Sequence, residues 1–256
     1  MTLHLLRVGV NMTALHRFAV ARRLDDDDLG YALHAASIAR YGAAAPRPFR
    51  FLPDHPRGSH LLGYLTDPDA LFDAAALPLA DDLVADIFTG APQVQAMPAH
   101  WRECARFGFE LRVRPVVRFG KRARAARGER DGTWQPRAGE IDAYVAACER
   151  AVLAEGDVDT IGRESVYTAW LDERIAGAAT LEQVTLRDFR RTRTRRSTHA
   201  NTGARTRAIE GPDALMIGTL SVSDPAAFAD LLARGVGRHA GFGFGMLLLA
   251  PATRGG

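Results

Sequence analysis

Tyr31 and His34 are three residues apart in the segment YALHAAS, so in a helix both side chains lie on one face. Histidine titrates near neutral pH, which makes it the natural group for moving a proton during catalysis. The pair is therefore a candidate for general acid–base chemistry, with His34 as the first candidate for transferring the proton. The same spacing continues through Ile38 and Tyr41, and on helical periodicity alone a half-buried core stripe is the favoured interpretation.

The other histidines give weaker signals. The chain contains eight of them, and no two have the HxxxH spacing of a helical zinc site, so we expect neither a metal nor a cofactor. The four aspartates at 25–28 are interpreted as the acidic start of a helix, because neighbouring carboxylates on a helix cannot all face one ion. His16 is a second candidate for proton transfer if a helix forms early in the chain, and His239 is a candidate for contact with phosphate.

A glycine-rich segment, GVGRHAGFGFGMLLL at 235–249, follows a predicted helix and precedes an apolar run. A dinucleotide-binding loop has the opposite order, and a P-loop needs a following Gly-Lys-Ser/Thr. A loop without Cβ atoms lets a phosphate backbone approach the main-chain amides, and Arg238 and His239 strengthen this interpretation. The alternative is a helix C-cap followed by a strand with glycines in it. The glycines that we predict to make room for nucleic acid, within reach of an imidazole, are Gly235, Gly237, Gly241, Gly243 and Gly245.

Basic side chains are concentrated in two segments, although the formal net charge is only +3. Residues 102–137 contain eleven Lys and Arg against four Asp and Glu, and residues 187–207 contain eight against one. This asymmetry favours an anionic partner, of which nucleic acid is the leading candidate, over a solvated loop without a partner. In a strand, alternate arginines would line one face, whereas in a loop they would form a basic finger. The candidate phosphate contacts are Arg190, Arg191, Arg193, Arg195, Arg196, Lys121 and Arg122.

The elements that must position these residues form one pattern twice. A strand at 3–10, a helix at 25–42, a hairpin around 56–58, a helix after Asp67 and a strand at 82–89 give β-α-β-β-α-β. A strand at 107–119, a helix at 163–177, two strands around the arginines, a helix after Asp224 and a closing strand repeat that order. We therefore predict an α+β fold of two tandem ferredoxin-like domains with antiparallel sheets. The expected boundaries are 1–95, a linker at 96–106, and 107–256, which carries a charged insertion at about 120–160, a basic hairpin and the glycine-rich loop.

Several segments, in order along the chain, resemble one known family. The glycine-rich segment, RPVVRFGKR at 114–122, ESVYTAWLDERI and YALHAAS are similar to segments of CasE-type CRISPR repeat-processing endoribonucleases of the type I-E Cascade complex. Residues 11–24 and 123–160 match no part of this pattern. The resemblance implies RRM-like domains of the RAMP superfamily.

The resemblance also implies the chemistry. A metal-independent endoribonuclease would cut CRISPR precursor RNA at the base of the repeat stem-loop by attack of the 2′-hydroxyl, giving a 2′,3′-cyclic phosphate and a 5′-hydroxyl. Tyr31 would orient the attacking hydroxyl or bind the scissile phosphate, and His34 would transfer the proton. The implied partners are the repeat RNA, the guide RNA that stays bound, and other Cascade subunits. A non-catalytic RNA-binding subunit of a CRISPR effector complex is the alternative.

No apolar run reaches the roughly 20 residues of a membrane span, so we expect no membrane partner. The first residues lack the features of a signal peptide. Cys104 and Cys148 lack paired spacing, which is typical of proteins in a reducing compartment. We therefore expect a cytoplasmic protein.

Overall fold

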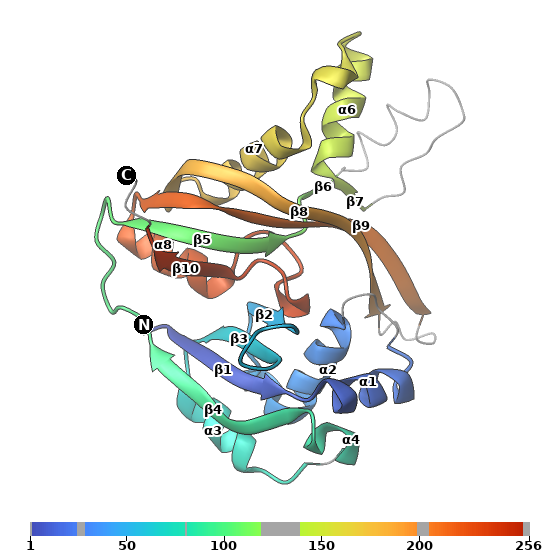
Figure 1. Cartoon of the computed structure of the whole chain (residues 1–256), viewed down its shortest axis with the longest axis vertical. Helices are drawn as coiled ribbons and strands as arrows, with labels where there is room; N and C mark the ends of the chain where they lie inside the picture. Colours follow the sequence, from blue (N-terminus) through green and yellow to red (C-terminus); the bar gives the residue numbers. More distant parts are fainter. Residues whose placement is uncertain (1, 25–28, 80, 119–138, 199–204, 253–256) are drawn as a thin grey trace.

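Two four-stranded antiparallel sheets with the same order of strands organise the chain (Figure 1). The computed structural model describes residues 2–24, 29–79, 81–118, 139–198 and 205–252, with side chains described except at 194–209. The first sheet has the order β2-β3-β1-β4 and the second β10-β5-β9-β8, which is the ferredoxin-like arrangement in both cases. The predicted tandem ferredoxin-like fold is confirmed.

The first half contains strands and helices in the predicted order. Apolar residues alternate along its central strand, where Leu6, Val8 and Val10 are buried. Asp67 caps α3 by accepting a hydrogen bond from the Ala70 amide, and Gly42 ends α2 with a positive φ. Its elements are β1 (His4–Val10), α1 (Met12–Ala21), α2 (Gly30–Tyr41), η1 (Gly42–Ala44), β2 (Phe49–Leu52), β3 (His60–Leu65), α3 (Pro68–Ala76), α4 (Asp82–Ala85) and β4 (Phe88–Ala96).

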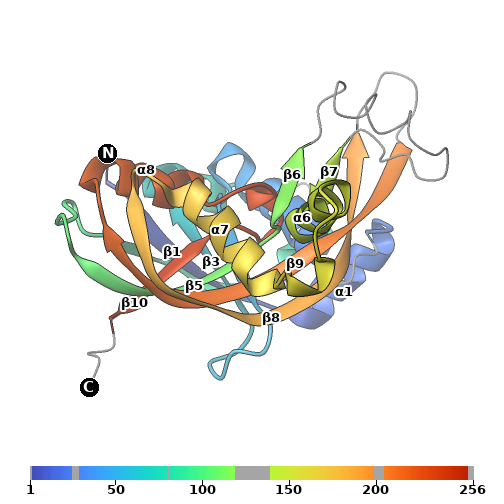
Figure 2. The ribbon, with the colours of Figure 1, turned by 90° about the horizontal axis from the view of Figure 1, so that it is seen from above.

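The second half adds a small two-stranded sheet and a helix between its first strand and α7. This insertion projects from the body of the molecule in Figure 1, and Figure 2 shows α7 running across the larger sheet. Its elements are β5 (Arg106–Val113), β6 (Val116–Arg118), β7 (Glu140–Asp142), α6 (Ala143–Leu153), η2 (Val158–Thr160), α7 (Arg163–Ile175), β8 (Ala179–Thr198), β9 (Arg205–Val222), α8 (Pro225–Arg234), η3 (Ala240–Phe242) and β10 (Leu247–Pro251).

Each four-stranded sheet has its own apolar core, and direct contacts join the two halves. The Tyr64 hydroxyl of β3 donates a hydrogen bond of 2.8 Å to the carbonyl of Leu247 in β10. Arg50 of β2 lies 3.3 Å from the carboxylate of Glu110 in β5. A buried hydrogen bond contributes about 0.5–1.5 kcal/mol, so these contacts fix how the sheets face each other. The domain boundaries given above stay a prediction.

Two predicted strands differ in the structure, and the structure defines two segments whose conformation the sequence left open. The strand predicted at 82–89 is wrong, because Asp81 caps the short helix α4 there and the last strand, β4, begins only at Phe88. The strand predicted at 107–119 is divided at Pro115, which has no N–H for the sheet, so β6 leaves to pair with β7. Residues 12–21, for which the sequence leaves a helix open, form α1, and the arginine-rich segment is strand as far as Thr198.

Candidate active site at the meeting of α2 and the glycine loop

The glycine loop, residues 235–245, packs onto the face of α2 that carries Tyr31 and His34. The ring of Phe242 stacks on Tyr31 at 5.7 Å between centroids and meets the His34 imidazole edge-on at 5.1 Å. Tyr31 and His34 lie on one helix face, as predicted, with their ring centroids 6.4 Å apart. A Cβ on Gly241 would lie 3.5 Å from Cε1 of His34, so the backbone of the loop passes about one methyl group away from the imidazole. The structure thus brings the loop and the predicted proton-transfer group together.

The shape of this loop depends on glycine conformations. Gly245 has a φ of +79°, and a Cβ there would lie 2.5 Å from the carbonyl oxygen of Val236. Gly237 has a φ of +77°, and its Cβ would lie 2.8 Å from the indole of Trp170. In both cases the group that comes close to the glycine belongs to the protein itself. Gly235 has a different role, because it ends α8 as a C-cap with a φ of +76°. Packing within the chain therefore explains these glycines, and room for RNA beside them stays a prediction.

The electrostatic surroundings of His34 favour its neutral form. Partial burial beneath the loop disfavours the imidazolium, and the nearby positive charge of Arg47 adds to this, so the pKa of His34 lies below its usual 6.5. A neutral imidazole at neutral pH has a free lone pair and can accept a proton. The sequence did not single out Arg47, which precedes β2 in the chain but lies beside Gly241 in space.

A carboxylate from β7 binds two basic side chains of the loop. Glu140 Oε2 lies 2.7 Å from Nε2 of His239, and Oε1 forms an ion pair with Arg238. The hydrogen bond from His239, supported by both positive charges, lowers the pKa of Glu140 to about 2. The sequence-predicted phosphate ligands Arg238 and His239 are therefore held by Glu140, a residue that carries no signal in the sequence.

Arginines from four elements surround a pocket of about 460 Å³ beside the loop. Arg118 comes from β6, Arg174 and Arg234 from the last turns of α7 and α8, and Arg238 from the loop. Gly235 and Gly237 also line it, whereas no Asp or Glu of the described chain does. Such a pocket attracts an anion. No pattern in the sequence singled out Arg118, Arg174 or Arg234, although Arg234 directly precedes the glycine segment.

The arginines of β8 are partly engaged with carboxylates of β9. Arg190 donates a hydrogen bond of 2.8 Å to Asp213, and Arg191 donates one of 2.7 Å to Glu210. Arg193 lies 3.8 Å from Glu210, and about two thirds of its side chain (69%) is exposed. Arg195 and Arg196 lie on the backbone of β8, with side chains outside the described part. Lys121, Arg122 and the aspartates at 25–28 lie outside the described residues.

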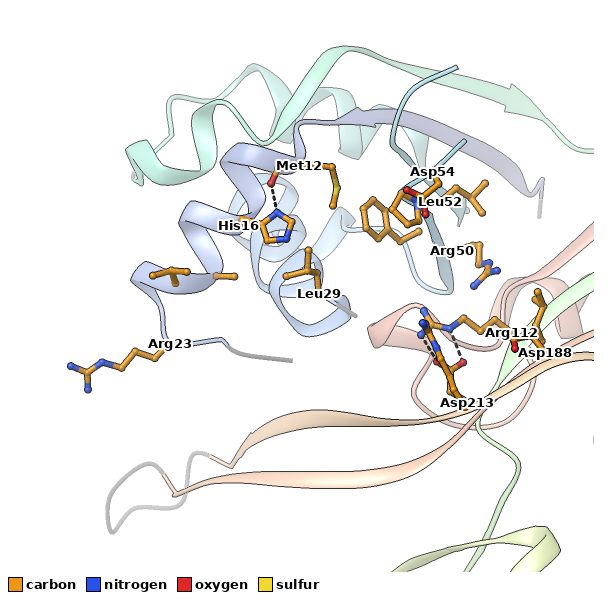
Figure 3. A pocket seen from close by; sticks show the side chains of 16 residues that line it. Met12, His16, Arg23, Leu29, Arg50, Leu52, Asp54, Arg112, Asp188 and Asp213 are labelled. Atoms are coloured by element: carbon orange, nitrogen blue, oxygen red, sulfur yellow. Dashed lines mark hydrogen bonds and ion pairs between the residues drawn. The ribbon is translucent and has the colours of Figure 1, made fainter. Parts of the chain in front are cut away.

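A cleft of about 900 Å³ separates α1 from the β8–β9 ribbon (Figure 3). Its lining includes His16, whose Nδ1 donates a hydrogen bond of 2.7 Å to the carbonyl of Met12. Arg112 donates two hydrogen bonds, of 2.8 and 2.6 Å, to Asp213 on the opposite side. Burial opposes the charge of Asp213, but these bonds outweigh it, so its pKa lies below the usual range. His16 thus belongs to this cleft, whereas Tyr31 and His34 contact the glycine loop.

The described residues contain neither a metal-binding cluster nor a membrane-spanning helix. No three His, Cys, Asp or Glu side chains come together there as a metal-binding set. A membrane-crossing length of apolar residues is found in none of the helices that the structure describes.

One protein family and several solved structures match the chain. The family described as CRISPR associated protein matches residues 3–251. A structure of the CRISPR endoribonuclease Cse3 bound to a 19-nucleotide RNA is 22% identical with a TM-score of 0.60, covering 98% of this chain and 100% of that one. The CRISPR-associated protein Cas6e of Escherichia coli K-12 is 16% identical with a TM-score of 0.54, covering 98% and 100%.

A chain of a CRISPR RNA-guided surveillance complex in a pre-nicking state is also similar. It is 18% identical with a TM-score of 0.53, covering 97% of this chain and 99% of that chain. At these identities the likeness to solved structures establishes a shared fold. No curated protein matches the chain significantly.

Proposed function

Because the chain belongs to the CRISPR associated protein family, we propose that it is a metal-independent endoribonuclease that cuts CRISPR precursor RNA at the base of the repeat stem-loop. The observation that carries this proposal is the contact between His34 and the glycine loop. An imidazole kept neutral by burial and by Arg47 is suited to accept a proton, and it lies next to main chain that carries no side chain at Gly241. Similar folds are found in an endoribonuclease bound to RNA and in a guide-RNA complex.

The proposed reaction needs one proton acceptor and one cation at the phosphate. His34 takes the proton of the 2′-hydroxyl, whose oxygen attacks the adjacent phosphorus. The bond from phosphorus to the 5′-oxygen then breaks, leaving a 2′,3′-cyclic phosphate, and the departing oxygen takes a proton from water to become a 5′-hydroxyl, while His34 returns its proton to solvent. Tyr31, stacked on Phe242, orients the hydroxyl or binds the phosphate. Arg47, beside Gly241 and His34, neutralises the charge that develops on the phosphorane.

Two basic surfaces are available to bind the RNA away from the scissile bond. The pocket of Arg118, Arg174, Arg234 and Arg238 lies beside the loop, and the arginines of β8 extend along the long β8–β9 ribbon. The major groove of A-form RNA is too narrow for side chains to read bases, so phosphate contacts would dominate affinity. Retention of the product by such contacts would leave the protein on the guide RNA as a Cascade subunit.

The proposal is tested with a hairpin repeat RNA in the presence of a chelator. The expected result is one cut at the base of the stem, with a cyclic phosphate on one product and a 5′-hydroxyl on the other. A copy with a single 2′-deoxy substitution at the scissile nucleotide should bind equally well and stay whole. Cutting of the deoxy copy would contradict the mechanism, and tight binding without any cutting would assign the chain to the non-catalytic RNA-binding class.

A further inference from the structure

Glu140 connects the insertion of the second half to the segment of the glycine loop that contacts His34. Its two carboxylate oxygens bind different residues of that segment: Oε2 binds His239 at 2.7 Å and Oε1 binds Arg238. The side chains of Glu140 and His239 are 15% and 9% exposed, so the pair is shielded from competing water. Hydrogen bonds to an ionised carboxylate are about twice as strong as neutral ones. Glu140 therefore fixes the position of residues 238 and 239.

His239 passes this constraint on to the aromatic ring above the imidazole. Its backbone lies in the left-handed region, with a φ of +67°, which is unfavourable for a residue with a Cβ and must be compensated by its contacts. The His239 carbonyl accepts a hydrogen bond of 2.8 Å from the amide of Phe242 and so closes the short turn η3. Phe242 in turn lies 5.1 Å from the ring centroid of His34. A continuous set of contacts thus leads from Glu140 to the imidazole.

We propose that Glu140 is a positioning residue for His34, acting by holding the turn 239–242 closed over the imidazole through His239 and Arg238. This inference rests on the proposed function, in which His34 moves the proton. Without the carboxylate, the turn loses both anchors and the left-handed His239 loses its compensation. Phe242 and Gly241 would then leave the imidazole, which would become more hydrated and less well oriented.

Binding of RNA by Glu140 itself is disfavoured, because a carboxylate repels phosphate and this one stays ionised, with a pKa of about 2. The two roles predict opposite effects on affinity. If Glu140 contacts RNA, its loss weakens binding. If it positions the turn, its loss removes a negative charge beside the arginine pocket and leaves binding unchanged or tighter.

The experiment compares Glu140→Gln with the control Glu173→Gln, which likewise removes one negative charge, from an exposed carboxylate that pairs with Arg174 of the arginine pocket. The RNA dissociation constant and the single-turnover cleavage rate at saturating protein are measured between pH 5 and 8. For Glu140→Gln we expect a rate lower by about ten- to a hundredfold, the cost of a misplaced catalytic group, with equal or tighter binding. The control should match the wild type.

The pH profile separates positioning from a general loss of structure. Of the described residues, the groups that face His34 are Arg47, Tyr31 on its own helix and, behind Phe242, His239. Glu140→Gln leaves Arg47 and Tyr31 in place and exposes the imidazole, so the acid limb of the rate profile should move to higher pH. A merely destabilised protein would keep the wild-type midpoint.

A second variant keeps the proposal testable if Glu140→Gln folds poorly. His239→Asn breaks the same link from the loop side, and asparagine tolerates the left-handed conformation. It should lower the rate and move the midpoint in the same direction, by up to as much as Glu140→Gln does, and the double variant should lose no more than Glu140→Gln alone. Losses that add in the double variant, a wild-type rate in Glu140→Gln, or weaker RNA binding in it would each overturn the inference. A wild-type protein that fails to cut the hairpin would instead overturn the proposed function.

Discussion

The imidazole of His34 lies edge-on against the ring of Phe242, with 5.1 Å between the ring centroids. The two residues are more than 200 positions apart in the chain, one on a helix of the first half and the other in a loop of the second. The contact covers one side of the imidazole with protein. The cation of Arg47 is also close enough to the imidazole to disfavour its protonated form. This arrangement determines how the rate should depend on pH and which variants should fold.

The acid limb of the pH–rate profile should report the pKa of His34. As a base, His34 is active when neutral, so kcat/KM falls as the pH drops through its pKa, and the midpoint should lie below 6.5. Arg47→Ala removes a positive charge that disfavours the imidazolium, so the midpoint should move to higher pH. The exposed Arg57, in the β2–β3 turn, provides the control Arg57→Ala, which should leave the midpoint in place. A midpoint that does not respond to Arg47→Ala would contradict this description.

The glycines of the loop should differ in their tolerance of alanine. Gly245→Ala forces a side chain into the left-handed region and against the Val236 carbonyl, so we expect a loss of at least about 1–2 kcal/mol in the free energy of unfolding. Gly241 has no positive φ and only ordinary contacts from 3.5 Å outward, so Gly241→Ala should cost no more than about 1 kcal/mol. Thermal and urea unfolding of both variants measure the difference. Equal effects would show that the loop is not held as described.

The Glu140 carboxylate should stabilise the fold in a pH-dependent way. Its pKa falls from an ordinary 4.5 to about 2 in the folded chain, so its stabilisation is complete above about pH 4.5 and is lost as the pH falls toward 2. The stability difference between wild type and Glu140→Gln, measured by urea unfolding, should therefore shrink below pH 4.5. A difference that stays constant down to pH 3 would exclude the ionised pair as its source.

The arginines of the β8–β9 ribbon should determine the salt dependence of RNA binding. Replacing Arg191 and Arg193 together by Ala should weaken binding and reduce the slope of log K against log salt by about 0.7–0.9 for each phosphate that the variant no longer binds. Arg106→Ala is a matched control, because Arg106 pairs with Glu182 elsewhere on the same sheet. An unchanged slope in the double variant would show that the RNA follows another surface.

The sequence was informative wherever a local pattern decides local structure. Helix caps at Asp67, Asp224 and Gly42 located three helices, and the spacing of Tyr31 and His34 placed both on one face. Prediction failed where a distant pairing is involved: beyond Pro115 the chain pairs as β6 with β7 and no longer with the larger sheet. Glu140 carried no signal, because its contacts are with residues about a hundred positions away. Arg47 carried none, because the fold and not a helical or strand spacing places it near His34 and Gly241.

The sequence located the glycine segment, but the structure gives a different reason for its glycines. Its spacing indicated a close approach of backbone, and such an approach exists at Gly237 and Gly245. The approaching groups are the protein's own Trp170 and Val236. A pattern of glycines indicates that there is no room for a Cβ at those positions. Which group occupies that room is known only from the fold.

The most direct test of the account is single-turnover cleavage of a hairpin repeat RNA, in chelator, by His34→Ala. Loss of the proton acceptor should lower the cleavage rate by about 10²–10⁴-fold while the RNA dissociation constant stays close to that of the wild type. The variant should also unfold at a similar temperature, because His34 is only partly buried. Cleavage by His34→Ala at the wild-type rate would show that the proton is moved by another group and that the site lies elsewhere.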